Sequence, residues 1–302
     1  MNRPRFLIMG ASGFIGAHLY SRLGPERALA TYHRAAVPGG VYFDAGHMKL
    51  ADSILRGDHG LTHAFLLHGI GKLDECARDP AGTAKVNVEG MQRTIDELAA
   101  AGIKIIFTSS DAVFDGSRGS WTEDDPTHPV LTYGRQKVAV EQHLMRMSVP
   151  WVIARLSKVV GADPGDHSLF GEWIRKIQGA ETIRCARDLT FAPIHVEDVV
   201  TALIGLAREE LTGVYNVCGP RSMTRLDLLE MFAAEVSKHS NAGIDVVPCS
   251  IRDFPFLEPR PIDGSMRADK LYRALGIRFQ DMELVCARIA REEFGAQDRA
   301  AV

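Results

Sequence analysis

Short apolar runs alternate with helical patterns through the first half of the chain. Buried strands are predicted at residues 5–9, 28–32, 41–43, 63–67, 103–108 and 151–154. Apolar residues that recur at helical spacing predict helices over residues 14–23, 81–101 and 134–147. Strands that alternate with helices form right-handed crossovers between parallel strands, with helices on both faces of the sheet. This half of the chain is therefore predicted to be a doubly wound α/β sheet.

The alternation breaks after about residue 160. Residues 169–178 are predicted as an amphipathic helix and Thr224–Val236 as a capped helix, whereas residues 248–261 form a proline-rich loop. The stretch 191–200 and the apolar segment around Val217 are expected to return to the sheet. We therefore expect a sheet domain of residues 1–160, with a return over 187–217. The smaller C-terminal lobe then comprises residues 161–186 and 218–302.

Composition narrows the function classes. Apolar residues make up 46% and charged residues 24%, which excludes wholesale disorder. The net charge is −3 and no block of Lys or Arg occurs, so nucleic acid is not an expected partner. No apolar run is long enough for a membrane span, and the segment before the first glycine does not suit a signal peptide. The five cysteines include no CxxC pair, which indicates free thiols in a cytoplasmic protein without a zinc cluster.

A glycine-rich segment, Gly10-Ala-Ser-Gly13-Phe-Ile-Gly16, follows the first predicted strand and opens the first helix. Glycines here allow a tight turn and a close approach of the backbone to a pyrophosphate, which the helix N-terminus then favours. The motif in this context predicts a Rossmann-type dinucleotide-binding domain.

The second strand ends in Thr31-Tyr32-His33-Arg34. Sheets that bind NAD usually place an acidic residue at this point, to bind the ribose 2′-hydroxyl. A guanidinium suits the extra phosphate of NADP instead, so we expect NADP(H). Asp44 follows the third strand, where a carboxylate can reach the adenine amine.

Candidate catalytic residues lie at the fifth strand and the helix that follows. Tyr133 and Lys137 are four residues apart, on one helix face. A cation beside a phenol is expected to lower its pKa and to make it useful for acid–base chemistry. Ser110 directly follows the fifth strand, where open α/β sheets bind ligands, and its hydroxyl can polarise a carbonyl.

Motifs in a fixed order carry a resemblance to a known family. They are GASGFIG at 10–16, DPAGTAKVNVEG at 79–90, TSSDAVFDG at 108–116, YGRQK at 133–137, ARLSKVVG at 154–161, GVYNVCGPRSMTRLDLL at 213–229 and RPIDGSMRADK at 260–270. Together they resemble the extended short-chain dehydrogenase/reductases, and within these the dTDP-4-dehydrorhamnose reductase-like sugar-nucleotide enzymes.

The resemblance implies a role for each matching residue. The cofactor pyrophosphate would lie against Gly10, Ser12, Gly13, Phe14 and Ile15, its 2′-phosphate against His33 and Arg34, and the rest of the cofactor along His68, Gly69 and Ile70. Tyr133 would donate the proton, Lys137 would modulate it and bind the ribose, and Ser110 would bind the carbonyl. Asp111 would contact the sugar and Arg260 the substrate diphosphate. The implied function is the NADPH-dependent reduction of a keto-sugar nucleotide of the 4-keto-6-deoxy type, by a homodimer.

Departures from the family pattern keep two alternatives open. Ser110 stands where the reductases usually have Thr and Ala112 where they have Tyr, and His68-Gly69-Ile70-Gly71 replaces an alanine-rich segment. One alternative is an NAD-dependent sugar-nucleotide epimerase or dehydratase, against which the basic end of the second strand argues. The other is a non-catalytic NADP-binding subunit, similar to the regulatory beta subunit of methionine adenosyltransferase. The intact Ser110, Tyr133 and Lys137 favour catalysis over this alternative.

Overall fold

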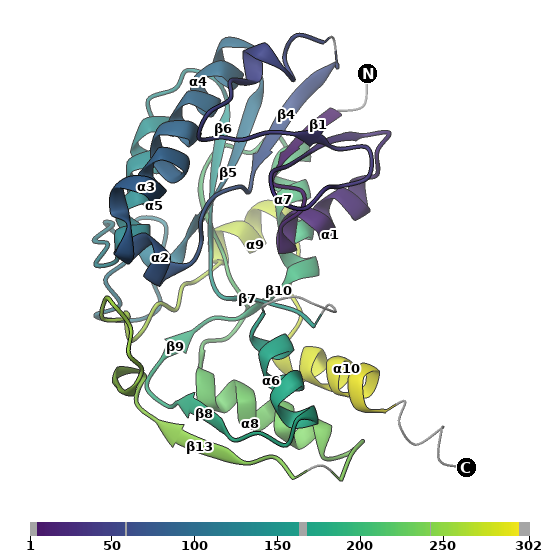
Figure 1. The fold of residues 1–302 in the computed structure, drawn as a ribbon, viewed down its shortest axis with the longest axis vertical. Helices are drawn as coiled ribbons and strands as arrows, with labels where there is room; N and C mark the ends of the chain where they lie inside the picture. Colours follow the sequence, from purple (N-terminus) through teal and green to yellow (C-terminus); the bar gives the residue numbers. More distant parts are fainter. Residues whose placement is uncertain (1–4, 58, 163–167, 242, 296–302) are drawn as a thin grey trace.

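A parallel sheet forms the centre of the larger part of the molecule, shown in the computed structural model of Figure 1. The structure describes residues 5–57, 59–162, 168–241 and 243–295. In the described chain the sheet has seven strands in the order β11-β6-β5-β4-β1-β2-β3. They are β1 (Arg5–Met9), β2 (Ala28–Tyr32), β3 (Val41–Tyr42), β4 (Leu61–Leu66), β5 (Lys104–Ser110), β6 (Trp151–Leu156) and β11 (Gly213–Val217). The predicted doubly wound, Rossmann-type sheet is confirmed.

Helices cover both faces of this sheet. On one face, α1 (Phe14–Leu23) and α7 (Val196–Arg208) bury Leu19 and Val199 in one apolar cluster. On the other face, α4 (Met91–Ala100) and α5 (Thr132–Leu144) contribute Leu98 and Val140 to a second. Figure 1 shows the two helix pairs on opposite sides of the strands. The strand order reverses between β1 and β4, and the carboxyl ends of strands at such a point form a ligand crevice.

The helix predicted over residues 81–101 is real but irregular. It consists of α3 (Pro80–Ala84), a π-helical turn over Lys85–Gly90, and α4. A Cβ on Gly90 would lie 2.2 Å from the Ala45 carbonyl oxygen, so this helical segment packs closely against the loop that contains Ala45. Single π-helical turns often occur at functional sites, and this one carries Asn87 into the interior. A short helix before it, α2 (Leu73–Arg78), is not indicated by the sequence pattern.

The stretch 191–200, expected to return to the sheet, adds no strand to it. Only β9 (Thr190–Phe191) and β10 (Ile194–His195) are extended, and both pair outside the large sheet, with β12 (Met223–Thr224) and β7 (Val159–Val160). From Val196 the chain is helical, because His195 caps the first turn of α7 by accepting a hydrogen bond from the amide of Glu197. The segment returns to the sheet as a covering helix, and Val217 returns as part of β11.

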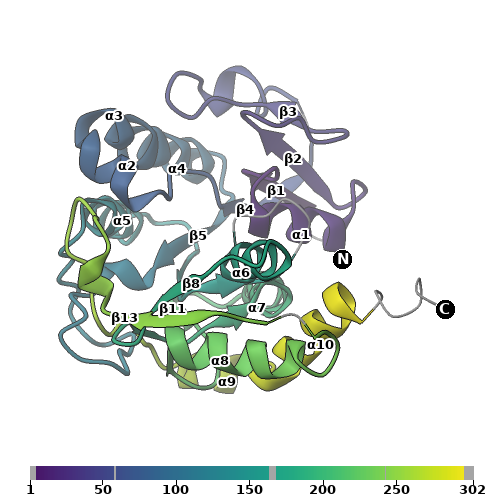
Figure 2. The same cartoon turned by 60° about the horizontal axis from the view of Figure 1, so that its bottom comes forward.

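The lower part of the molecule has its own apolar core. It is formed by α6 (Leu169–Gln178), β8 (Ile183–Ala186), α8 (Arg225–Val236), β13 (Val246–Cys249) and α10 (Met282–Phe294). Helix α9 (Asp269–Leu275), although it lies between these elements in the sequence, packs on the sheet domain. Phe170, Trp173 and Phe232 form an aromatic cluster at the centre of the lower core. Figure 2 shows β8 and β13 side by side, with α8 along them. The predicted α6 and the cap of α8 at Thr224 are confirmed, whereas residues 248–249 belong to a strand instead of the expected loop.

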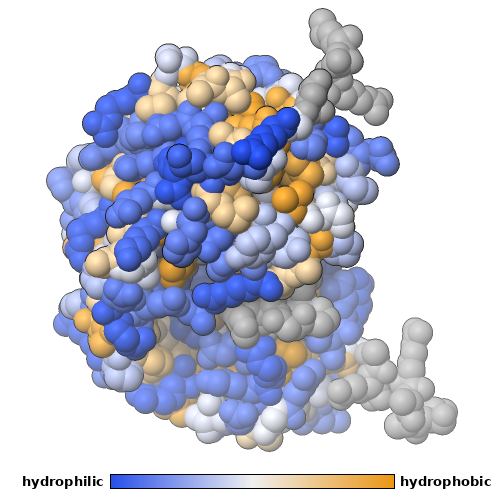
Figure 3. All heavy atoms as spheres, turned by 45° about the horizontal axis from the view of Figure 1, so that its top comes forward, coloured by the Kyte–Doolittle hydropathy of each residue, from blue (hydrophilic) through white to orange (hydrophobic). Residues whose placement is uncertain are grey.

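Several general features accompany this fold. All five cysteines are buried and free. In the described residues no helix has the length and apolarity needed to cross a membrane. No group of three or more possible metal ligands occurs in that part of the chain either. On the face shown in Figure 3, hydrophobic residues form small separate patches among hydrophilic ones.

Candidate active site

The turn between β1 and α1 is shaped by its glycines. Gly10 has a φ of +89°, and a Cβ there would lie 2.9 Å from the backbone nitrogen of His68. A Cβ on Gly16 would lie 2.2 Å from the carbonyl oxygen of Gly10. Gly13 caps α1 without a side chain, and no acidic residue occupies the first turn of that helix. The amides of Gly10, Ala11 and Gly13 donate within the fold, to Thr31 and to the Gly10 carbonyl. The N-terminus of α1, which carries no acidic residue, is the part of the turn that favours an anion such as a pyrophosphate.

Basic residues follow β2, as the sequence indicates. Arg34 is exposed and has no ion-pair partner among the described residues. His33 lies 3.7 Å from Asp44, measured from Nε2 to Oδ2. Asp44 also accepts hydrogen bonds from the Gly46 amide and from His47, and the bond with His47 helps to hold its pKa below the usual range. The structure thus brings His33 and Asp44 together, and leaves Arg34 available to a phosphate.

The loop after β4 carries a histidine with unused hydrogen-bonding capacity. Both ring nitrogens of His68 are shielded from solvent and have no hydrogen-bond partner. Burial, helped by the positive charge of Lys137, lowers the pKa of His68 to about 3. The neutral ring therefore offers one donor and one acceptor to whatever binds in the crevice.

A buried amide network holds this loop against α5. The side chain of Asn87 accepts from the Ile70 amide at 2.7 Å and donates to the Ile70 carbonyl at 3.0 Å. It also donates to Gln136 at 2.7 Å, and Gln136 donates to Thr83 at 2.9 Å. Sequence reasoning missed both amides as functional residues, although Asn87 lies in the recognised segment 79–90. Their network fixes the loop containing His68 and Gly69 relative to the helix that carries Tyr133.

Ser110, Tyr133 and Lys137 lie at the C-terminal end of β5 and in the first two turns of α5. The ammonium of Lys137 donates to the Thr108 carbonyl at 2.8 Å and lies 5.5 Å from the centre of the Tyr133 ring. Burial lowers the pKa of Lys137 to about 8. The hydroxyl of Ser110 donates to Asp111 at 2.8 Å.

The expected lowering of the Tyr133 pKa is wrong for this structure. Burial, together with the negative charge of Asp111, raises the pKa of the phenol above its usual value. The Lys137 ammonium hydrogen-bonds Thr108 and lies near the tyrosine ring, and its charge does not offset the loss of hydration. Tyr133 therefore keeps its proton at neutral pH, which is the form that a proton donor requires.

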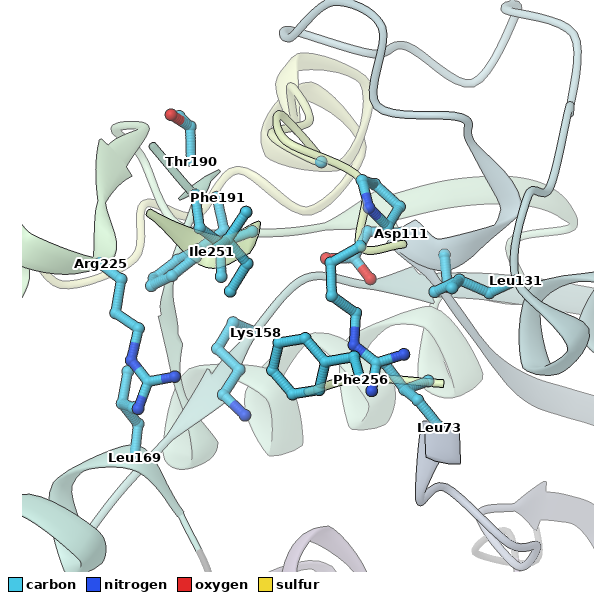
Figure 4. Close-up of a pocket in the computed structure, with 15 residues that line it drawn as sticks. Leu73, Asp111, Leu131, Lys158, Leu169, Thr190, Phe191, Arg225, Ile251 and Phe256 are labelled. Carbon is cyan, nitrogen blue, oxygen red and sulfur yellow. The ribbon is translucent and has the colours of Figure 1, made fainter. Parts of the chain in front are cut away.

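A cavity of about 360 Å³ separates this edge of the sheet from the lower lobe (Figure 4). Its lining comes from segments that are far apart in the sequence: Leu73, Asp111, Ala112, Leu131, Lys158, Leu169, Leu189, Thr190, Phe191, Arg225, Ile251, Phe256, Arg260, Pro261 and Gly264. Three of these residues are basic and one is acidic. Figure 4 shows Lys158 between Arg225 and Phe256.

The cations of this pocket keep unused donors. Arg260 donates to Asp74 at 2.7 Å and lies 4.2 Å over the Phe256 ring, but its Nη1 is buried without a partner. Arg225 reaches Glu172 at 3.4 Å, and its Nε is also buried and unpartnered. Lys158 lines the same pocket and its side chain is exposed there. The N–H groups of Arg260 and Arg225 that have no partner fit the phosphates of a nucleotide. Of the three, sequence reasoning identified only Arg260.

Asp111 is the acid of the pocket. Burial raises its pKa to about 6, although the bond from Ser110 and the charge of Lys158 act in the opposite direction. Its carboxylate accepts from Ser110 and lines the pocket, so it can also bind a hydroxyl of a ligand that reaches the serine.

Comparisons with known proteins agree with this geometry. The model of the RmlD substrate binding domain family matches residues 4–293. The dTDP-4-dehydrorhamnose reductase of Sinorhizobium fredii (strain NBRC 101917 / NGR234) is 23% identical over 292 residues, covering 92% of this chain and 94% of that protein. The methionine adenosyltransferase 2 subunit beta of Rattus norvegicus is 25% identical over 239 residues, covering 74% of this chain and 70% of that protein.

Solved structures show the same fold. The dTDP-4-dehydrorhamnose reductase of Bacillus anthracis str. Ames, in complex with NADP, superimposes with a TM-score of 0.83 at 22% identity. The match covers 96% of this chain and 100% of that chain. The likeness therefore extends over the sheet, the crevice and the lower lobe.

Proposed function

The chain belongs to the RmlD substrate binding domain family, as its motifs indicate, and on that premise we propose that it is an NADPH-dependent reductase of a keto-sugar nucleotide. The carbonyl would be that of a 4-keto-6-deoxy sugar. One observation carries the proposal: Ser110, Tyr133 and Lys137 share the sheet edge that borders a pocket with three cations. This arrangement supports a proton donor close to a site for a diphosphate.

The residues of the crevice fit NADP(H). A Cβ at Gly10 or Gly16 would fill the space at the turn, so these positions favour a backbone cradle for the pyrophosphate. Ser12, Gly13, Phe14 and Ile15 would complete the cradle, while His33 and Arg34 would bind the 2′-phosphate. Asp44 would meet the adenine, with His68, Gly69 and Ile70 along the rest of the molecule. When bound, NADPH would supply the hydride for reduction of the carbonyl.

Residues of the chain would supply the proton and stabilise the charge that its transfer leaves behind. Tyr133 would donate its phenolic proton to the carbonyl oxygen as that oxygen gains charge. The hydroxyl proton of Ser110, which goes to Asp111 in this structure, would turn to the same oxygen. The ammonium of Lys137 would stabilise the phenolate that the transfer leaves behind. Since Lys137 is anchored on Thr108, its charge stays close to the tyrosine during the reaction.

The nucleotide sugar would lie across the pocket. The diphosphate would bind to Arg260, Lys158 and Arg225, and a sugar hydroxyl to Asp111. The substrate lobe would comprise residues 161–186 and 218–302, and the cofactor domain residues 1–160 and 187–217. The pocket takes residues from both parts, so substrate would bind at their junction.

A second candidate function is NADP binding without catalysis. It is favoured by the likeness to the subunit beta of a methionine adenosyltransferase. A thermal-shift titration with NADPH and NADH, alongside UDP-, dTDP-, GDP- and CDP-sugars, separates the candidates, since a ligand of the native state raises the melting temperature. Stabilisation by NADPH and by one nucleotide class supports the reductase. Response to NADPH alone supports the binding subunit, and NAD that copurifies supports an epimerase or dehydratase.

A further inference from the structure

Helix α5 takes its N-terminal cap from a residue 126 positions away. Its own cap position is Leu131, whose side chain makes no capping hydrogen bond. Instead, both carboxylate oxygens of Glu258 lie 3.0 Å from the amide nitrogen of Thr132. One of them also accepts from the Thr132 hydroxyl at 2.8 Å and from Arg135 at 3.0 Å. A carboxylate at this point satisfies free amides and complements the positive end of the helix.

The segment that carries Glu258 is also a wall of the pocket. Phe256 and Arg260, two residues to either side, both line the cavity. A second attachment lies beside them, because Asp74 of α2 accepts from the Leu257 amide at 3.2 Å and from Arg260 at 2.7 Å. The segment is therefore fixed to the sheet domain at two points, one on α5 and one on α2.

We propose that Glu258 is a positioning residue for the reaction: it couples the placement of the 256–260 pocket wall to the placement of Tyr133. The inference rests on the proposed function. Tyr133 directly follows the capped residue Thr132, so the cap fixes the turn that carries the phenol. A nucleotide that binds Arg260 and packs on Phe256 holds the wall in place, and with it the cap.

The geometry separates this role from general support of the helix. Lys137 lies one turn further along and is anchored on Thr108, independently of Glu258. The glycine turn lies on another loop, between β1 and α1. Loss of the cap should therefore disturb the phenol relative to the substrate carbonyl while NADPH binding stays the same. Misplacement of a reacting group by about 1 Å can lower a rate by up to about 10²-fold.

Steady-state kinetics with four variants test the proposal. Glu258→Ala should lower kcat by about tenfold with little change in the Kd for NADPH. Glu258→Gln keeps an oxygen for Thr132 and should restore most of the lost kcat. Arg135→Ala removes the ion pair with Glu258 and the bonds of Arg135 to the Val130 carbonyl and the Thr132 hydroxyl, but leaves the Glu258 carboxylate on the Thr132 amide. This variant should stay within about twofold of the unchanged protein. Asp74→Ala frees Arg260 from its acceptor and should act mainly on KM.

Amide exchange of Thr132, followed by NMR, gives a readout that needs no turnover. In the absence of ligands, the Thr132 amide should exchange about fivefold faster in Glu258→Ala than in the unchanged protein. Its exchange rate should stay the same in Arg135→Ala. Added UDP or dTDP should slow this exchange in the unchanged protein but not in Glu258→Ala. A Glu258→Ala variant that raises KM alone, or a Thr132 amide that ignores both the variant and the nucleotides, overturns the proposal. An unchanged protein that reduces no keto-sugar nucleotide, with the exchange results as expected, contradicts the proposed function and leaves the coupling of wall and helix in place.

Discussion

The two sides of the crevice are built in different ways. The turn at Gly10–Gly16 is made of backbone, and its shape depends on the absence of side chains within one short segment. The pocket opposite is made of side chains, and its three cations come from residues 158, 225 and 260. A backbone site is encoded locally, whereas a side-chain site depends on how distant segments pack. Binding at the glycine turn should therefore be sensitive to substitutions that add volume, and binding at the pocket to substitutions that remove a charge.

In the proposed reaction the phenol serves cofactor and substrate together, so its removal should have the largest effect. Tyr133→Phe keeps the ring but removes the proton, and we expect kcat to fall by about 10²-fold or more. The Kd for NADPH, measured by fluorescence titration, should stay within about twofold, since the glycine turn is untouched. A variant that kept its rate would show that Tyr133 is not the proton donor.

Added volume at the turn should damage only the cofactor side. A Cβ at Gly16 would meet backbone atoms of Gly10 and Ala11 at 2.2 and 2.8 Å, which cannot rotate away. Gly16→Ala should lower the free energy of unfolding by about 1–3 kcal/mol. We expect NADPH affinity to fall by at least about tenfold. The control is Gly243→Ala, because a Cβ there meets nothing within 4 Å. Equal losses in both variants would contradict the close-packed turn.

Removal of a cation from the pocket should weaken only the binding of the nucleotide sugar. Arg225→Met keeps much of the side-chain volume and removes a cation of the pocket, so KM for the nucleotide sugar should rise by about tenfold. NADPH affinity should stay the same. Arg221→Met is a matched control, since Arg221 is exposed and pairs with Glu283 at the surface. If Arg221→Met raised KM equally, general electrostatics would explain the result instead of the pocket.

The smallest expected effect is a pH-dependent increase in the free energy of unfolding when Asp111 is replaced by Asn. Because the pKa of this carboxyl in the fold is about 6 against an ordinary 3.8, its ionisation opposes folding above that range. Asp111→Asn should therefore raise the free energy of unfolding by about 1 kcal/mol at neutral pH, and the gain should shrink as the pH falls from about 6 to about 4.

Urea denaturation across this pH range measures the gain, with Asp115→Asn as the control of opposite sign. The Ser117 amide holds the pKa of Asp115 below its usual value, so ionised Asp115 favours the fold. Its removal should lower stability at neutral pH and have less effect as the pH falls through its pKa. A gain at Asp111 that did not depend on pH would contradict the assignment to its charge.

The same contrast explains what could be predicted from the sequence. The first six strands of the large sheet, α1, the glycine turn and the place of Ser110 follow from local patterns, and the structure has them close to where they are expected. Lys158, Arg225 and Glu258 were missed because their neighbours in space are distant in sequence. The form in which the segment after residue 191 returns to the sheet could not be predicted for a related reason, since apolar residues suit both a buried strand and a covering helix. The cap by His195 decides between them.

The raised pKa of Tyr133 could not be predicted either. The four-residue spacing predicts that Lys137 lies near Tyr133. It does not predict that the phenol is buried or that the charge of Asp111 lies close to it. Burial is a property of the assembled cleft, so the balance of these effects appears only in three dimensions.

The most direct test of the proposed function is the consumption of NADPH by the purified protein in the presence of a nucleotide-linked 4-keto-6-deoxy sugar. We expect the absorbance of the reduced nicotinamide to fall only when both are present, faster with NADPH than with NADH, and the sugar carbonyl to become a hydroxyl. If the protein binds NADPH yet consumes none with any keto-sugar nucleotide of the four bases, it is not a reductase of this class.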